Sequence, residues 1–261
     1  MKKPISNGLN QPFTGPWYAL IQPRPFPGSE YDLTAACGLT LCQPRKGFRF
    51  THDALLLYSV LTAGASSVLE IGSGCGILSL LYAGKNPESR VTGVDILEVN
   101  ARLAGYNAQI NGLSNVSFLH RDIRLFHPDR LYGLIFSNPP YRRAGTGRLS
   151  PSAHKNAALY DSSLDMDALF SAAERLLSPQ GAFFMIIWKG RQDEMVMSAG
   201  KQGLFPFELT LFKGEKESHH AFVAAGFSRS KGLCRYVVKD KETWAEQARC
   251  LMNTDEERKG L

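Results

Sequence analysis

Short apolar runs alternate with helical segments through the middle of the sequence, and this alternation restricts the fold more than any other feature. The runs that we expect to be strands are Val68–Ile71, Val91–Val94, Val116–Leu119 and Leu134–Phe136. Between them, Gly76–Ala83 and Glu98–Ile110 have helical spacing, and the second segment is closed by Asn111-Gly112. Buried parallel strands joined by crossover helices produce this pattern. The sequence therefore predicts an α/β fold in which a doubly wound, mostly parallel sheet carries helices on both faces.

The C-terminal part continues the pattern and then changes it. We expect a helix at Asp165–Leu177, a turn at Ser178–Gly181 and a strand at Ala182–Trp188. Three further strands are expected at Phe207–Phe212, Ala221–Ala225 and Leu233–Val238. Because no long helix separates the last two, they suit an antiparallel pair that closes one edge of the sheet. A terminal helix at Lys241–Met252 and a frayed tail at 253–261 complete the prediction.

The N-terminal part reads as an extension and a cover for the main domain. Residues 1–36 are rich in proline, glycine and polar groups, which predicts a partly irregular extension. Leu39–Gln43 and Phe48–Phe50 flank Pro44-Arg45-Lys46-Gly47, so we expect a hairpin with its turn there, followed by a helix at Asp53–Leu61. We therefore divide the chain into an extension (1–36), a hairpin and helix over the ligand site (37–66) and a main domain (67–252).

Composition excludes some classes of protein. With 44% hydrophobic residues among 261, a sizeable core is available, yet no run approaches the ~18 apolar residues of a membrane span. The basic N-terminus lacks the apolar stretch of a secretory signal, and the five cysteines complete no zinc pattern. We expect a cytoplasmic protein with reduced thiols and no catalytic metal. A formal net charge of +6 is compatible with a nucleic-acid partner.

A glycine-rich loop follows the first strand of the alternating region. Glu70 precedes it, and Gly72, Gly74 and Gly76 stand at alternate positions, where they permit a tight turn and a close approach of backbone to ligand. Position 77 is Ile, so the G-x-G-x-x-G pattern of nicotinamide and flavin sites is absent. Ligands of such sheets bind at the carboxyl ends of the strands, which places a ligand here.

Two acidic residues stand at the ends of the next strands. Asp95 can accept hydrogen bonds from both ribose hydroxyls of an adenosine, with Ile96 beside it, although an Asp in this position is also an ordinary helix N-cap. Asp122 can meet the adenine amino group with Ile123 against the ring, or can be a solvated loop carboxylate. Their positions beside the glycine loop favour the ligand-binding interpretation for both.

The fourth strand ends in Asn138-Pro139-Pro140-Tyr141. Two prolines fix the backbone and remove two donors, so the turn is stiff. Alone, this turn is equally consistent with a structural role. Beside a cofactor, the Asn138 side-chain oxygen and the Pro139 carbonyl can accept the two N–H bonds of a planar amine, and Tyr141 can stack on its ring.

Several motifs resemble known families. The Glu70 loop resembles the first motif of class I S-adenosylmethionine methyltransferases, and Asn138–Tyr141 resembles the acceptor motif of methyltransferases that act on amide or aryl-amine nitrogens. Gln43–Leu57 and Arg142–Pro151 resemble the bacterial tRNA(Val) adenine-N6 methyltransferases, and the resemblance extends from about 38 to 238. It implies a class I methyltransferase fold, S-adenosylmethionine as donor, and methylation of the adenosine 3′ of the anticodon. The chain departs from the family pattern at Ala157–Asp161.

The resemblance also suggests roles for residues around the motifs. Thr51 and Asp53, with Phe50, would cover the methionine end of the cofactor, or would simply begin a helix over the core. Basic residues near the acceptor turn are candidate phosphate contacts, although such charges are often a solvated surface. They are Arg142, Arg143, Arg148 and Lys155 after the turn, and Arg45, Lys46 and Arg49 on the predicted hairpin.

Other functions stay open at this point. The same turn suits N-methylation of a glutamine in a protein such as a release factor, and guanine-N2 or DNA adenine methylation is also compatible. A cofactor-binding module without catalysis would not need Asn138. A protein that only binds nucleic acid would be expected to carry a recognisable RNA-binding module, and we find none.

Overall fold

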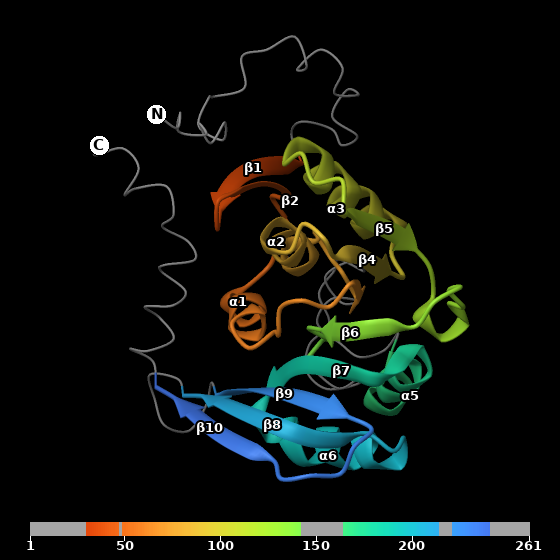
Figure 1. Cartoon of the computed structure of the whole chain (residues 1–261). Coiled ribbons are helices and arrows are strands. Elements are labelled where there is room, and N and C mark those ends of the chain that lie inside the picture. The colour runs from red at the N-terminus through yellow and green to blue at the C-terminus, as the bar shows by residue number, and fades with distance from the viewer. Residues whose placement is uncertain (1–29, 47–48, 142–163, 214–220, 241–261) are drawn as a thin grey trace, which may run out of the picture.

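The computed structural model describes residues 30–46, 49–141, 164–213 and 221–240. Eight of the described strands form one sheet in the order β10-β8-β9-β7-β6-β3-β4-β5, and β1 and β2 form a separate hairpin (Figure 1). The strands are β1 (Tyr31–Ala36), β2 (Leu39–Pro44), β3 (Ser67–Ile71), β4 (Arg90–Asp95), β5 (Val116–His120), β6 (Tyr132–Ser137), β7 (Leu177–Trp188), β8 (Phe205–Phe212), β9 (Phe222–Ser228) and β10 (Arg235–Lys239). The α-helices are α1 (His52–Tyr58), α2 (Ile77–Lys85), α3 (Glu98–Ile110), α5 (Met166–Leu176) and α6 (Gln192–Lys201), and short 3-10 turns are η2 (Ile123–Leu125) and η3 (Lys189–Arg191).

The sheet is parallel at its centre and antiparallel toward one edge. Strands β5, β4, β3, β6 and β7 pair in parallel, whereas β9 is antiparallel to both of its neighbours, β7 and β8. The edge strand β10 pairs in parallel with β8. The predicted α/β fold with a mostly parallel sheet is confirmed, and an antiparallel pair, β8 with β9, lies near its C-terminal edge. The antiparallel pairing predicted for the last two strands is wrong, because β10 adds in parallel to the other side of β8 and does not pair with β9.

Alternate residues of the central strands pack into two hydrophobic cores on opposite faces of the sheet. Leu69 and Ile135 belong to the core that α5 and α6 cover. Their neighbours Val68 and Leu134 belong to the core under α1 and α2. All four side chains are at most 1% exposed, which explains why these strands read as continuous apolar runs. The arrangement brings the carboxyl ends of β3, β4, β5 and β6 to one edge, where the candidate residues lie.

The hairpin prediction was wrong in its position. Strand β1 pairs antiparallel with β2, and the turn is Cys37-Gly38, with φ of +56° and +73°. Positive φ at both central residues suits the twist of a two-residue hairpin, and the glycine adopts it without strain. Arg45 N–H donates to the Glu30 carbonyl at 2.8 Å and closes the other end. The segment predicted as the hairpin turn therefore leads out of β2, and residues 47–48 lie outside the described ones.

Two asparagines attach the hairpin to the main domain: Asn107 in α3, and Asn111, which caps the C-terminal end of that helix. Asn107 Oδ1 accepts from Cys42 N–H at 2.7 Å, while its Nδ2 donates to the carbonyls of Cys42 (3.1 Å) and Cys75 (2.9 Å). Asn111 makes the same pair of bonds with Thr40, at 2.9 and 2.7 Å. These amides satisfy the free edge of β2 as a neighbouring strand would, and Asn107 also links the hairpin to the glycine loop.

Other boundaries differ less. Helix α3 has the predicted bounds, and Asp165 caps α5 through a 2.8 Å bond from Ala168 N–H. The predicted turn at Ser178–Gly181 lies within β7, opposite a register shift in β6. Helix α6 was not predicted. The predicted helix Lys241–Met252 lies outside the described residues, and none of the described helices is long and apolar enough to cross a membrane.

Candidate active site

The loop between β3 and α2 holds the three glycines that the sequence singled out. All three have positive φ, +76° at Gly72, +54° at Gly74 and +87° at Gly76. A Cβ on Gly76 would lie 2.9 Å from both the Ala104 Cβ and the Phe118 ring, so this position admits only glycine. A Cβ on Gly72 or Gly74 would meet nothing within 4 Å, which shows open space above that part of the loop.

Glu70 ties the start of this loop to its end. Its carboxylate is 2% exposed, and one oxygen accepts from Ser79 N–H (3.0 Å) and Ser79 Oγ (2.5 Å) in the first turn of α2. Burial raises the pKa of Glu70 to about 8; Asp95 raises it further and the Ser79 bonds oppose the shift. Glu70 therefore braces the loop, and a direct contact with a cofactor stays a prediction.

Asp95, at the end of β4, connects the glycine loop to the start of α3. One carboxylate oxygen accepts from Gly74 N–H at 2.8 Å. The other accepts from Leu97 N–H at 2.9 Å and from Asn100 Nδ2 at 3.1 Å. The N-cap residue of α3 is Leu97, so Asp95 is not the simple N-cap of that helix.

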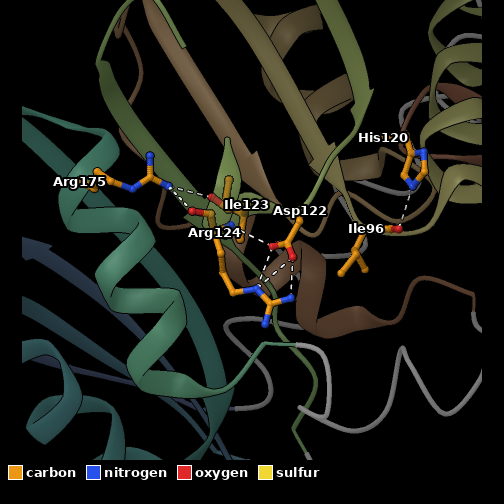
Figure 2. A network of polar contacts seen from close by, with 6 residues as sticks. All are labelled: Ile96, His120, Asp122, Ile123, Arg124 and Arg175. Carbon is orange, nitrogen blue, oxygen red and sulfur yellow. Dashed lines mark hydrogen bonds and ion pairs between the residues drawn. The ribbon is translucent and has the colours of Figure 1, made fainter. Parts of the chain in front are cut away.

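Two arginines fix the segment of Asp122 and η2, which forms the next side of the site (Figure 2). Arg124 Nε donates to both oxygens of Asp122, at 2.9 and 3.0 Å, and Arg124 Nη2 donates at 2.5 Å. These bonds hold the pKa of Asp122 below its usual value, and partial burial opposes them. Arg175, from α5, donates to the carbonyls of Phe126 (2.6 Å), Ile123 (2.8 Å) and Arg124 (3.4 Å). One guanidinium thus fixes the whole η2 turn.

A cavity lies between these walls at the carboxyl edge of the sheet. Across from η2, His120 Nε2 lies 3.1 Å from the Ile96 carbonyl oxygen and holds the other side in place (Figure 2). The cavity is bounded by the glycine loop, the end of β4, η2 and the acceptor turn; its lining includes Gly72, Gly74, Asp95, Ile96, Asp122, Ile123, Asn138, Pro139 and Pro140. A second, adjoining hollow is lined by Phe50, Glu70, Ser73 and Asn138 among others. The cavity therefore brings together residues that the sequence placed on four separate segments.

The acceptor turn leaves β6 next to the glycine loop. Ser137 Oγ donates to the Ile71 carbonyl at 2.8 Å, so the ends of β6 and β3 are fastened together. Asn138 follows directly and faces both hollows. Its Nδ2 donates to Asp53 Oδ2 at 2.8 Å across 85 residues of sequence.

Asp53 is the centre of a buried cluster that the sequence did not predict. Its side chain is 4% exposed. One carboxylate oxygen accepts from the Thr51 hydroxyl, and the other accepts from Asn138 Nδ2 and from the Tyr141 hydroxyl. The same hydroxyl lies 2.5 Å from Asn138 Oδ1. Because Nδ2 donates to the carboxylate, Oδ1 is the acceptor of this amide; it accepts from the Tyr141 hydroxyl and has a second lone pair for another donor.

Tyr141 is held through its hydroxyl, its ring and its backbone carbonyl. Its ring centroid lies 5.3 Å from that of Phe222 at the start of β9, and its carbonyl accepts from Arg191 Nη1 at 3.4 Å. Burial raises the pKa of Tyr141 well above its ordinary value; the charge of Asp53 and its hydrogen bond add to this, and the bond with Asn138 opposes it. The phenol therefore stays protonated and donates a hydrogen bond within the cluster.

Comparison with known proteins identifies the family. Residues 51–200 match the family described as Methyltransferase small domain, which is more than half of the chain. The chain belongs to this family. A relative from Phocaeicola vulgatus, named tRNA1(Val) (adenine(37)-N6)-methyltransferase, is 31% identical over 77% of this chain and 85% of its own length. A relative of the same name from Flavobacteriaceae bacterium (strain 3519-10) is also 31% identical, over 57% of this chain. This chain spans 63% of that relative's length.

Solved structures agree on the fold. A methyltransferase from Pyrococcus furiosus has a TM-score of 0.54 and 20% identity, covering 74% of this chain and 90% of its own. TYW2 from M. jannaschii, solved in complex with AdoMet, has a TM-score of 0.55 and 12% identity, covering 78% and 89%. The predicted methyltransferase family and its Rossmann-like fold are therefore confirmed.

S-adenosylmethionine is the methyl donor of this methyltransferase family, as predicted, and the site residues fit it. The open space above Gly72 and Gly74 leaves room for a ligand against the backbone. Asp95 and Asp122 place carboxylates on the cavity wall, with apolar Ile96 and Ile123 beside them. In the adjoining hollow, Ser73 Oγ is buried and has no hydrogen-bond partner among the described residues. An orphaned hydroxyl at this point suits the polar end of a ligand.

The other predicted site residues differ in what they contact. Thr51 and Asp53 do not line either hollow; their contacts are with each other and with the acceptor turn. Arg45 and Arg49 both pair with Asp32 of the hairpin, at 2.6 and 3.4 Å, so part of their charge is already matched. Lys46 is exposed. The predicted contacts Arg142, Arg143, Arg148 and Lys155 lie outside the described residues.

Sequence reasoning missed three residues that shape the methyltransferase site. Arg175 fixes η2, Phe222 packs on Tyr141, and Arg191 holds the Tyr141 carbonyl. None belongs to a motif, and each acts from an element more than 45 residues away from its partner, so only the fold reveals them. Within the described residues, no group of three or more His, Cys, Asp or Glu side chains could hold a metal ion.

Proposed function

We propose that this protein transfers a methyl group from S-adenosylmethionine to the exocyclic N6 amine of an adenine in RNA, with tRNA1(Val) as the substrate. The names of the relatives support the RNA and the base. The observation that carries the chemistry is the place of Asn138 at the border of both hollows, with the orientation of its amide fixed by the bond from Nδ2 to Asp53. A formal charge of +6 suits a polyanionic substrate.

The acceptor amine needs alignment more than it needs a base. Its lone pair is delocalised into the ring, so it is a weak nucleophile until its two N–H bonds are held. Asn138 Oδ1 and the Pro139 carbonyl would accept those two bonds and direct the nitrogen toward the methyl group. S-adenosylmethionine supplies an electrophilic methyl on a sulfonium.

Asp53 strengthens this acceptor electrostatically. As the nitrogen attacks, positive charge develops on it, and its N–H groups become better donors. A hydrogen bond from Asn138 Nδ2 to a buried carboxylate polarises the amide, so that its oxygen becomes a stronger acceptor. The Asp53 side chain is buried, so its charge would be felt at the reacting nitrogen through low-dielectric surroundings. The excess proton of the product amine leaves to solvent.

The donor would lie along the cavity in a defined direction. Asp95 and Ile96 would meet the ribose, Asp122 and Ile123 the adenine, and the loop of Gly72, Gly74 and Gly76 the remainder, with Glu70 bracing that loop. This order leaves the sulfonium end beside Asn138, because Asn138 borders both hollows. The basic residues after the acceptor turn would contact RNA phosphates. The proposal places the protein in the cytoplasm, with its tRNA.

The test measures which of several candidate substrates receives a labelled methyl group. The protein is incubated with methyl-labelled S-adenosylmethionine and separate pools of unmodified tRNA, rRNA, DNA and release factor. We expect label in tRNA, and loss of label with Asn138→Ala although that variant still binds S-adenosylhomocysteine. Label in release factor alone would assign the acceptor as a glutamine amide and overturn the proposal.

A further inference from the structure

Trp188, the last residue of β7, has an exposed indole ring that is held against the rigid backbone. It is 45% exposed, whereas the five residues before it in the strand, Phe183–Ile187, are at most 1% exposed. A Cβ on Gly190 would lie 2.9 Å from the Trp188 ring, so the ring rests directly against the backbone of η3. Lys189 N–H donates to the Ala221 carbonyl at 2.9 Å and fixes the turn that follows. The ring is therefore both held and open to solvent.

The pairing of β7 with β9 places this ring close to the acceptor turn. Trp188 stands opposite Phe222 in the antiparallel register. Side chains of directly opposed residues lie on the same face, with their Cβ atoms about 5 Å apart. The Phe222 ring centroid in turn lies 5.3 Å from that of Tyr141. Trp188 is thus one side chain removed from Tyr141, at the same carboxyl edge of the sheet.

The chemistry around the ring suits a nucleotide. An exposed indole offers a flat π-face on which any base can stack, and such stacking is sequence-tolerant. Lys189, the exposed residue that follows Trp188, adds a positive charge next to the ring. The charge of Arg191 is engaged by Glu194 through a 2.6 Å ion pair, so Lys189 is the neighbour suited to a phosphate.

We propose that Trp188 is a stacking site for the RNA base adjacent to the target adenine. The inference rests on the proposed function, since it assumes an RNA with its target base at Asn138. A flanking base stacked on Trp188 would hold the strand in its splayed form while the target base occupies the acceptor turn. Lys189 would contact the phosphate between the two nucleotides.

Steady-state kinetics with full-length variants test this site. Trp188→Ala should raise the KM for tRNA about 5- to 150-fold, the range that stacking of one base supplies. Trp188→Phe keeps a ring and should retain most of the affinity. The Kd for S-adenosylhomocysteine should not change in either variant. Tyr236→Ala is the matched control, because Tyr236 is an exposed aromatic (54%) on the edge strand β10, three strands from β7. An unchanged KM in Trp188→Ala would overturn the inference.

A fluorescence titration reads the same contact without turnover. In a Trp17→Phe, Trp244→Phe background, Trp188 is the remaining tryptophan. With S-adenosylhomocysteine bound, addition of unmodified tRNA should quench its emission, and a tRNA with an abasic flanking position should quench it less. Equal quenching by both would refute stacking while leaving methyl transfer to RNA intact. If the wild-type protein methylates no RNA, the proposed function is wrong, and the inference, which depends on it, is wrong as well.

Discussion

Replacing Asp53 by Asn removes one negative charge from the centre of the acceptor cluster and leaves the side chain nearly the same size. The new amide can donate a hydrogen bond where the carboxylate could only accept. Asn138 can then rotate by 180° and receive that bond through its oxygen. In this orientation the NH₂ group of Asn138 would face the acceptor amine, which also carries N–H donors, and the two would repel each other.

The size of the effect follows from the bond that is lost. A hydrogen bond to a buried charged group is worth about 1.5–3 kcal/mol. If that loss appears mainly in the transition state, kcat falls roughly 10- to 150-fold, because each 1.36 kcal/mol is tenfold in rate. Binding of S-adenosylmethionine should be unaffected, since Asp53 lines neither hollow of the cofactor site.

The assay separates chemistry from binding. Single-turnover rates of Asp53→Asn are measured at saturating tRNA and cofactor, and the Kd for S-adenosylmethionine is measured by calorimetry. Asp32→Asn is a control of the same chemical change on the hairpin, where the side chain is 38% exposed, and it should leave the rate unchanged. A normal single-turnover rate in Asp53→Asn would refute the reasoning. A raised Kd with a normal rate would instead restore Asp53 to the cofactor-binding role that the sequence suggested.

Three further changes test other parts of the structure. Arg175→Ala removes three hydrogen bonds that fix η2, so the Kd for S-adenosylmethionine should rise about tenfold with kcat preserved. A Kd equal to that of the wild type would show that η2 keeps its conformation without Arg175. The stability of Glu70→Gln should increase relative to that of the wild type as the pH rises. In the wild-type protein the folded state raises the pKa of Glu70 to about 8, so the native state keeps a proton that the unfolded chain loses near pH 4.5. Wild-type stability therefore falls across that window by up to about 1.4 kcal/mol per pH unit, and urea denaturation at pH 5 and pH 8 should show the gap widening, not closing. Asn107→Ala removes three hydrogen bonds to the backbone of Cys42 and Cys75 and should cost about 2–4 kcal/mol of unfolding free energy, clearly more than Asn111→Ala at the exposed end. Equal losses would contradict the attachment of the hairpin through Asn107.

The central sheet was predictable because local signals there agree with the tertiary structure. The buried strands are short apolar runs, the glycines mark the turn that only they can make, and Asn111-Gly112 ends α3 at the expected residue. The predicted residues that line the cavity could be found for the same reason, since they stand at or just after the ends of neighbouring strands at one edge of the sheet. Their individual contacts with a cofactor stay predictions.

The remainder depended on contacts between distant segments. Pro44–Gly47 has the stronger turn composition, yet β2 pairs with the preceding segment Tyr31–Ala36. The other edge of β2 is satisfied by Asn107 of α3 and by Asn111, which caps its C-terminal end. The role of Asp53 is set by partners 85 and 88 residues away. No local pattern encodes such a bond, so the sequence placed Asp53 beside the cofactor and missed the cluster.

The most direct test of the account is the identity of the methylated nucleoside. Unmodified tRNA1(Val) is incubated with the protein and methyl-deuterated S-adenosylmethionine, digested to nucleosides and analysed by mass spectrometry. The account predicts deuterated N6-methyladenosine with the wild-type protein and none with Asn138→Ala. A deuterated methyl group on another nucleoside, or none in the tRNA, would contradict it.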